Sequence, residues 1–166
     1  MKKVVKIFLL VTFSLLLTLN AFANTGTFSL TINDANYTFS GVTGNMYNFG
    51  YYYSDRANNI DLELESEDIL FYLEMFVPNS TNRLAQGTYN LSNHYLQFTY
   101  SYGEFWTDDH GYIEIIGGAI TVDVSGSGDN AVYTITFECD TIDEDEKIGT
   151  LKGTYRGPLG WEDWEE

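Results

Sequence analysis

Tyrosines are concentrated in two stretches of this 166-residue chain, and their rings are the side chains best suited to binding a ligand. The stretches are YNFGYYYSD at 47–55 and HYLQFTYSYGEFW at 94–106. A tyrosine or tryptophan ring has a rigid apolar face and a polar tip, which suits sugar rings, small apolar molecules and peptide partners. Tyrosine is also a common strand residue, so part of such a set can simply pack in a core. We predict a ligand-binding set that comprises Tyr47, Tyr51, Tyr53, Tyr95, Tyr100, Tyr102 and Trp106.

Two carboxylates interrupt otherwise apolar stretches, Glu74 in FYLEMFV and Glu114 in YIEII. A buried carboxylate is unfavourable unless it is paired or solvated, so each residue lines either an internal cavity or a solvated rim. Glycoside hydrolysis needs two carboxylates that face each other across a cleft. The acidic residues of NIDLELES at 59–66 share one face of a strand, which a solvated surface explains more simply. We assign no catalytic residue from these patterns.

An acidic turn, TDDHG at 107–111, places Asp108, Asp109 and His110 near Glu104. Oxygen-rich loops suit calcium, but the EF-hand spacing is absent and no His/Cys cluster indicates zinc. Aspartates in a turn usually serve the turn itself. We therefore predict neither a metal site nor a cofactor.

The only cysteine lies in ECDTIDEDEK at 138–147, where acidic residues are densest. The alternation of VYTITFEC puts Cys139 on the same face as Phe137, which predicts a buried, unreactive thiol. Residues 140–147 are then expected to connect two strands of a hairpin, with their carboxylates on a solvated tip. A single cysteine excludes an internal disulfide.

Alternation of apolar and polar residues with a period of two predicts the elements that position these side chains. It is clearest in TFSLTIN, NIDLELES, AITVDVS and VYTITFEC, which are typical of half-buried antiparallel strands. The apolar run ILFYLEMFV favours a strand over a helix because of its aromatic content and Pro78. A bend is expected at Gly117-Gly118. We predict nine to ten strands in one all-β domain, either an antiparallel β-sandwich or a flattened, calycin-like β-barrel.

The charge balance excludes some partners. The chain carries 24 acidic residues against 8 Lys and Arg, for a net charge of −16. Such a chain repels phosphate backbones, so nucleic-acid binding is excluded and anionic membrane surfaces are disfavoured. The aromatic content of 16% is too high for a disordered chain.

The first residues have the three-part pattern of a secretory signal peptide. Lys2, Lys3 and Lys6 precede an apolar stretch at 7–19, and Ala21-Phe22-Ala23 is a cleavage motif. We expect cleavage after Ala23, a folded domain at 24–166 and a secreted or periplasmic location. No stretch after the cleavage site is apolar and long enough to be a transmembrane segment.

The order of short motifs in the second half resembles a group of small secreted or lipid-anchored β-rich proteins of Bacteroidetes. The matching positions are Gly87, Thr88, Tyr89, Leu91, Gly117, Gly118, Val122, Tyr133, Ile135, Phe137, Ile148, Gly153, Tyr155 and Gly157. The resemblance implies an all-β extracytoplasmic domain and no defined activity. It also implies that Thr141, in the triplet DTI, is a candidate acceptor for an O-linked glycan. This chain has no lipidation cysteine at the cleavage site.

Three functions are consistent with these observations. The first is a non-catalytic binding module for glycans or small apolar ligands, which uses a tyrosine-rich face or cavity. The second is a structural or interaction protein of the cell envelope that takes no small ligand. The third is an envelope hydrolase that uses paired carboxylates.

Overall fold

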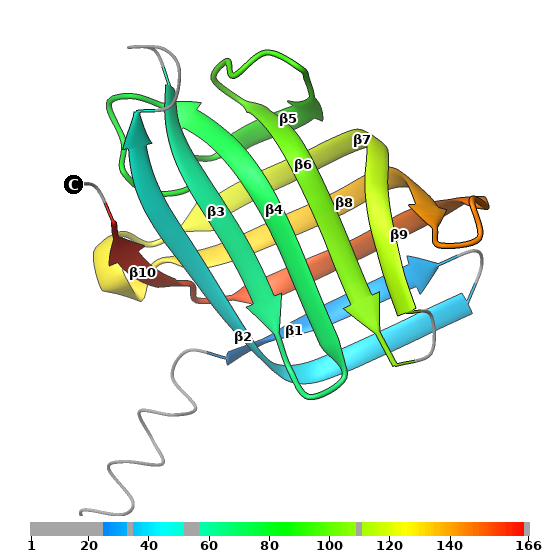
Figure 1. Cartoon of the computed structure of the whole chain (residues 1–166). Coiled ribbons are helices and arrows are strands. Elements are labelled where there is room, and N and C mark those ends of the chain that lie inside the picture. Colours follow the sequence, from blue (N-terminus) through cyan, green and yellow to red (C-terminus); the bar gives the residue numbers. More distant parts are fainter. Residues whose placement is uncertain (1–24, 33–34, 52–56, 109–110, 165–166) are drawn as a thin grey trace, which may run out of the picture.

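The computed structural model describes residues 25–32, 35–51, 57–108 and 111–164 as ten strands and one short 3-10 turn (Figure 1). The predicted signal peptide lies outside these residues. No helix in the described part of the chain is both long enough and apolar enough to cross a membrane. The strands are β1 (Thr25–Ile32), β2 (Ala35–Tyr51), β3 (Ala57–Glu65), β4 (Ile69–Pro78), β5 (Gly87–Leu91), β6 (Thr99–Thr107), β7 (Gly111–Ser125), β8 (Val132–Asp143), β9 (Ile148–Gly157) and β10 (Gly160–Asp163).

All ten strands belong to one sheet that closes on itself, which confirms the predicted all-β fold, a flattened barrel or sandwich. Eight strands form an antiparallel ring in the order β1-β2-β3-β4-β6-β7-β8-β9, and β9 pairs again with β1. Strand β5 fills the gap where β6 and β7 diverge, and it runs parallel to β6. Strand β10 adds to β2 in parallel. Ring closure leaves few unpaired strand edges.

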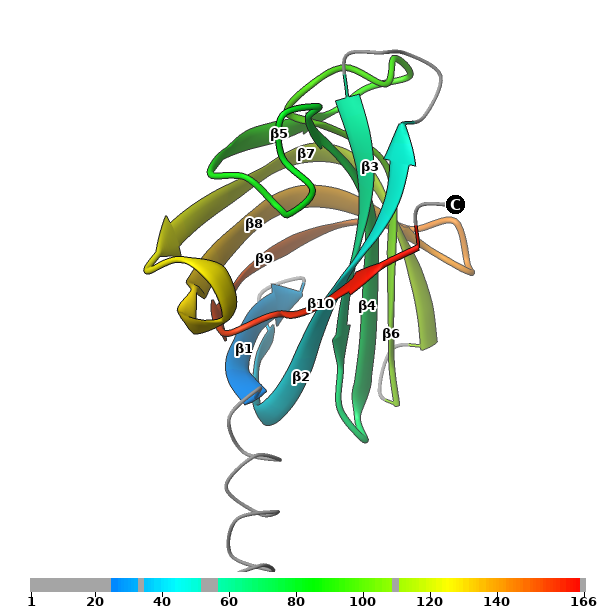
Figure 2. The same cartoon turned by 90° about the vertical axis from the view of Figure 1, so that its left-hand side faces the viewer.

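The ring is flattened into two layers whose strands cross steeply. Strands β3, β4 and β6 form the front layer of Figure 1, and β8 and β9 cross behind them. Figure 2 shows the same two layers from the side. The long strands β2 and β7 bend and so belong to both layers. The outward side of the front layer is consequently one continuous surface that runs from β2 to the first half of β7.

Bulges at glycines produce the two bends. In β2 the register shifts beside Gly41, which has a φ of 73°. In β7 it shifts between Ile115 and Gly117, and Gly118 has a φ of 98°. A side chain at Gly118 would place its Cβ 2.2 Å from the carbonyl oxygen of Glu138. The predicted bend at Gly117-Gly118 is therefore confirmed, and only glycine fits there.

Aromatic rings fill the space between the two layers. Phe71 lies 4.7 Å from Phe137 and 5.4 Å from Phe28 between ring centroids, and all three side chains are fully buried. The predicted inward face of NIDLELES is confirmed, because Ile60, Leu62 and Leu64 are also fully buried. Phe71 comes from β4 in the front layer and Phe137 from β8 in the back layer, so their contact fills the space between the layers.

Strand β8 extends further than the sequence indicates, so the prediction that residues 140–147 form the hairpin connection is wrong in part. Residues 140–143 belong to the strand, and the connection spans only 144–147. The alternation continues one step past Cys139, because Thr141 points inward and pairs with Ile115 and Gly149. Cys139 is buried as predicted, and burial raises the pKa of its thiol to about 12.

Candidate ligand-binding face

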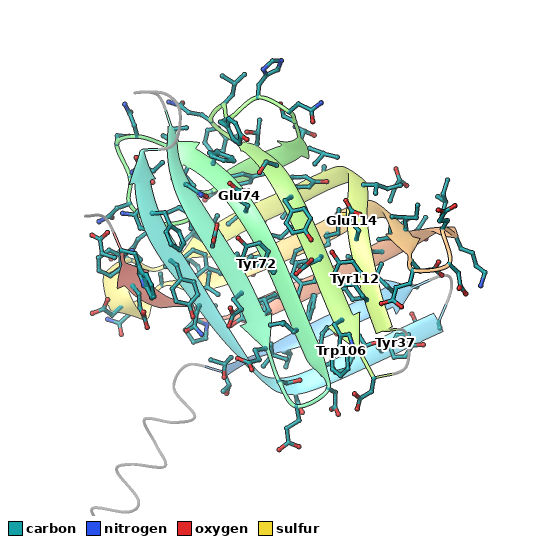
Figure 3. All side chains as sticks on the ribbon, in the orientation of Figure 1. Tyr37, Tyr72, Glu74, Trp106, Tyr112 and Glu114 are labelled. Carbon is teal, nitrogen blue, oxygen red and sulfur yellow. The ribbon has the colours of Figure 1, made fainter. Side chains whose placement is uncertain are left out.

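Outward side chains of β2, β3, β4, β6 and β7 form three rows that run across the front layer (Figure 3). Each row joins residues that are direct cross-strand partners, and together we call them the acidic tyrosine face. The rows are Glu65, Leu70, Trp106 and Tyr112; then Glu63, Tyr72, Glu104 and Glu114; then Tyr47, Asp61, Glu74 and Tyr102. The face therefore carries carboxylates and aromatic rings side by side on rigid strands.

The strands present these side chains because their inward neighbours are apolar. Leu62 and Leu73 alternate with Asp61, Tyr72 and Glu74, so the apolar set is buried and the polar set faces out. Strand β6 departs from regular alternation, because its register against β4 shifts between Glu74 and Met75. This bulge at Ser101 sets which tyrosines of β6 face outward.

Asp61 is a half-buried carboxylate of the face. The phenol of Tyr72 donates a hydrogen bond of 2.7 Å to Oδ2 of Asp61. The other oxygen, Oδ1, is buried and has no donor. Burial raises the pKa of Asp61 to about 6, the Tyr72 hydrogen bond opposes the rise, and the charge of Glu74 adds to it. Asp61 therefore titrates close to neutral pH.

Glu74 lies beside Asp61 and accepts two hydrogen bonds from neighbouring side chains. Ser101 Oγ donates at 2.7 Å, and Asn59 Nδ2 donates at 3.4 Å. Asn59 is only 7% exposed, and its own oxygen Oδ1 has no partner. Two buried acceptors therefore lack donors here, one on Asp61, the strand partner of Glu74, and one on Asn59, two residues before it in β3.

Glu104 is the centre of a second cluster. The phenols of Tyr102 and Tyr112 both donate to its Oε2, the latter at 2.5 Å, and the two phenol oxygens are 2.6 Å apart. Burial and the bond to Glu104 raise the pKa of Tyr102, and the bond to Glu104 raises that of Tyr112. Both phenols therefore stay protonated and keep donating to the carboxylate.

Apolar surface is exposed at the edge of the face. Leu70, Trp106 and Tyr112 are 42%, 40% and 36% exposed and are neighbours in the first row. Ile116, further along β7, is 39% exposed. Leu70, Trp106 and Tyr112 therefore form a contiguous apolar row at one edge of the face.

The structure brings together only part of the predicted tyrosine set. Tyr47, Tyr102 and Trp106 belong to the face. Tyr95 lies between β5 and β6, where its ring packs 4.9 Å from that of Phe76. Tyr100 is fully buried and donates to the carbonyl of Gly117 at 3.0 Å, so we leave it out of the candidate site. The side chain of Tyr51 and all of Tyr53 lie outside the described residues.

Sequence reasoning missed Tyr72 and Tyr112 as members of the face. The signal that could have found them is the period of two, since each tyrosine stands two residues before Glu74 or Glu114 and so shares its face in a regular strand. Glu74 and Glu114 lie on the outer face with them (Figure 3), so the alternative of an internal cavity position is wrong for both.

The other predicted positions add no chemistry to the face. Asp109 and His110 of the acidic turn lie outside the described residues. Elsewhere in the described ranges no group of three or more His, Cys, Asp or Glu is arranged to hold a metal. Thr141 is 3% exposed, so an O-linked glycan on it requires attachment before the strand folds.

The outer face of the back layer has a different character. A row of hydroxyl side chains crosses six strands there. Part of this row lines a hollow of 320 Å³, together with Lys152 and Glu138. The row is Thr38, Ser29, Thr154, Thr136, Thr121 and Thr88. A second hollow, of 570 Å³, adjoins the acidic tyrosine face at Glu65 and is lined mainly by polar residues of β2 and the β3–β4 turn.

No protein-family model matches the chain, and no curated protein matches it either.

Proposed function

We propose that the protein is a non-catalytic binding module that takes glycans on its acidic tyrosine face. The observation that carries this proposal is the set of aromatic rings and carboxylates in register across the front layer. Rings such as Trp106 and Tyr112 can stack on the apolar faces of sugars, and carboxylate oxygens can accept hydrogen bonds from sugar hydroxyls. Rigid strands hold both groups in place before the ligand arrives, which lowers the entropy lost on binding.

A surface site is favoured over an interior one. Phe28, Phe71 and Phe137 pack against one another in the middle of the barrel, which is where a small apolar ligand would have to sit. Of the two versions of the binding module, the one that uses an outer face therefore agrees better with the packing.

The location of the protein is part of the proposal. The signal-peptide pattern at 1–23 and the resemblance to secreted Bacteroidetes proteins support a secreted or periplasmic module. Glycans are abundant outside the cytoplasm, and so an extracytoplasmic location is consistent with the proposed ligand class.

Removal of the exposed rings tests the proposal. The purified protein is screened against a broad glycan panel, and hits are measured by isothermal titration calorimetry. We expect Trp106→Ala together with Tyr112→Ala to weaken the best hit by about tenfold or more, because each lost ring contact is worth about 1 kcal/mol. Leu96→Ala, which truncates a 49% exposed side chain in the loop before β6, at the opposite end of that strand from Trp106, is the matched control and should bind normally. A panel without hits contradicts the proposal.

The exposed apolar row favours a second candidate, an interaction protein of the cell envelope without a small ligand. Leu70 and Ile116 add aliphatic surface that sugars do not need. If this is correct, no glycan binds, and cross-linking in the native envelope captures a protein partner that Leu70→Asp releases.

A further inference from the structure

The acidic tyrosine face has more hydrogen-bond acceptors than donors. The protons of Tyr72, Tyr102 and Tyr112 are engaged with Asp61 or Glu104. The Ser101 hydroxyl and one N–H of the Asn59 amide likewise donate to Glu74. These donors are therefore committed to the protein, and a ligand meets mainly oxygen atoms.

Acceptor capacity is left over in the second and third rows, those of Glu104 and Glu74. Each carboxylate has two oxygens with about four acceptor sites, and the observed bonds fill only some of them. Oδ1 of Asp61 has no donor at all. Oδ1 of Asn59 also lacks one, although the residue is more than nine-tenths buried and its amide touches Glu74. A buried acceptor without a donor is unfavourable, so this part of the face favours a ligand that brings donors.

No described cation neutralises the face. The two ion pairs within the described ranges join Arg83 to Asp129 and Lys147 to Asp145, away from the three rows. Lys152 and Arg156 lie on β9, in the back layer. The carboxylates of the face therefore repel one another, and a positively charged ligand relieves that repulsion.

We infer that the acidic tyrosine face selects glycans with free amino groups, a deepening that rests on the proposed function. An ammonium group has three donors and no acceptor, which matches a surface rich in acceptors. Its charge is attracted to carboxylates such as Glu74 and Glu104 and to the faces of aromatic rings. The sugar rings that carry the ammonium groups stack on the tyrosines and Trp106, which a simple cation cannot do.

Two oligosaccharides that differ only in acetylation test the inference. Calorimetry at pH 6 compares a glucosamine hexamer, whose amines are charged, with the N-acetylglucosamine hexamer. We expect the glucosamine hexamer to bind at least tenfold more tightly, and added salt to weaken it selectively. We also expect Glu74→Gln with Glu104→Gln to reduce its affinity by about tenfold and that of the acetylated hexamer much less, because glutamine loses the charge but keeps an oxygen that accepts from hydroxyls. Glu138→Gln also removes a negative charge, but from the back layer, and should not change the affinity for either hexamer.

The outcomes separate this inference from the proposed function. Equal affinity for the two hexamers overturns amine selection but keeps glycan binding. Binding of neither hexamer, together with an empty glycan panel, overturns both. An oligolysine of matched charge is the third ligand. If it competes as well as the glucosamine hexamer and Trp106→Ala does not affect either, the face recognises basic peptides and the inference is wrong. Circular dichroism confirms that each variant is folded.

Discussion

Tyr72 and Asp61 are joined by a diagonal hydrogen bond of 2.7 Å between β4 and β3, and the second oxygen of Asp61 has no donor. The direct strand partners of these residues are Glu63 and Glu74, so Asp61 is surrounded by other carboxylates. The hydrogen bond from Tyr72 therefore stabilises the charged form of Asp61, which burial and the charge of Glu74 both disfavour. Ionisation of Asp61 consequently lowers the free energy of unfolding of the protein.

Replacing Asp61 by asparagine should stabilise the protein at neutral pH. Because its pKa is raised from 3.8 to about 6, the folded state binds more protons than the unfolded state between these values. The contribution of Asp61 to stability is fully present below pH 3.8 and is lost as the pH rises through 6. We expect Asp61→Asn to raise the free energy of unfolding at pH 7 by about 1–2 kcal/mol, allowing for solvent screening.

Urea unfolding from pH 3 to pH 8 measures this effect. The difference between Asp61→Asn and wild type should disappear towards pH 3 and reach a plateau above pH 7. Asp68→Asn, which removes an exposed carboxylate from the turn between β3 and β4, is the control and should leave the free energy of unfolding at pH 7 close to that of wild type. A variant that is less stable than wild type at pH 7 contradicts the interpretation.

The bend of β7 should tolerate no side chain. Gly118→Ala would push its Cβ against the backbone of β8 at a φ of 98°, so we expect a loss of about 3 kcal/mol or more, or failure to fold. Gly128 also has a positive φ, of 57°, but has open space around it, so Gly128→Ala should cost only about 1–2 kcal/mol. Thermal unfolding of both variants tests this, and equal losses would show that the contact with β8 is unimportant.

The thiol of Cys139 should be inert in the folded protein. It is 4% exposed and burial raises its pKa to about 12, so almost no thiolate exists at pH 8. We expect a thiol reagent to label the native protein at least a hundredfold more slowly than the protein in denaturant. Because the chain has a single cysteine, the signal comes from this residue alone. Rapid labelling in the native state is the result that rules out a closed core here.

The hydrolase hypothesis predicts turnover that depends on Glu74 or Glu114, and we expect none. Neither residue lines the two hollows of 570 and 320 Å³, and water can reach the outer face freely. Bound oligosaccharides should therefore stay intact over long incubations, as followed by mass spectrometry. If products form and Glu74→Gln or Glu114→Gln abolishes them while Glu138→Gln does not, the protein is a hydrolase and the binding-module proposal is wrong.

Local alternation predicted which side of each regular strand is buried. Ile60, Leu62 and Leu64 are buried, and Asp61 and Glu63 between them face outward, as the period of two requires. This pattern depends only on neighbouring residues of one strand. It could therefore be determined before any strand was paired with another.

Membership of the candidate site depended on pairing as well. Tyr100 and Tyr102 are two residues apart and would share a face in a regular strand. The bulge at Ser101 reverses this, so that Tyr100 pairs with Met75 in the core and Tyr102 pairs with Glu74 outside. A bulge arises from the fit between two strands, and the residues of one strand do not indicate it.

The sequence by itself determined the all-β class, the inward and outward faces of the regular strands and the large excess of acid, because these depend on residue type and spacing. Only the tertiary structure decided that Tyr72 meets Asp61, that Tyr102 and Tyr112 converge on Glu104, and that three rows form one face. These contacts require a register between strands that are far apart in the chain. That register is set by closure of the ring and packing of the core, to which every strand contributes at once.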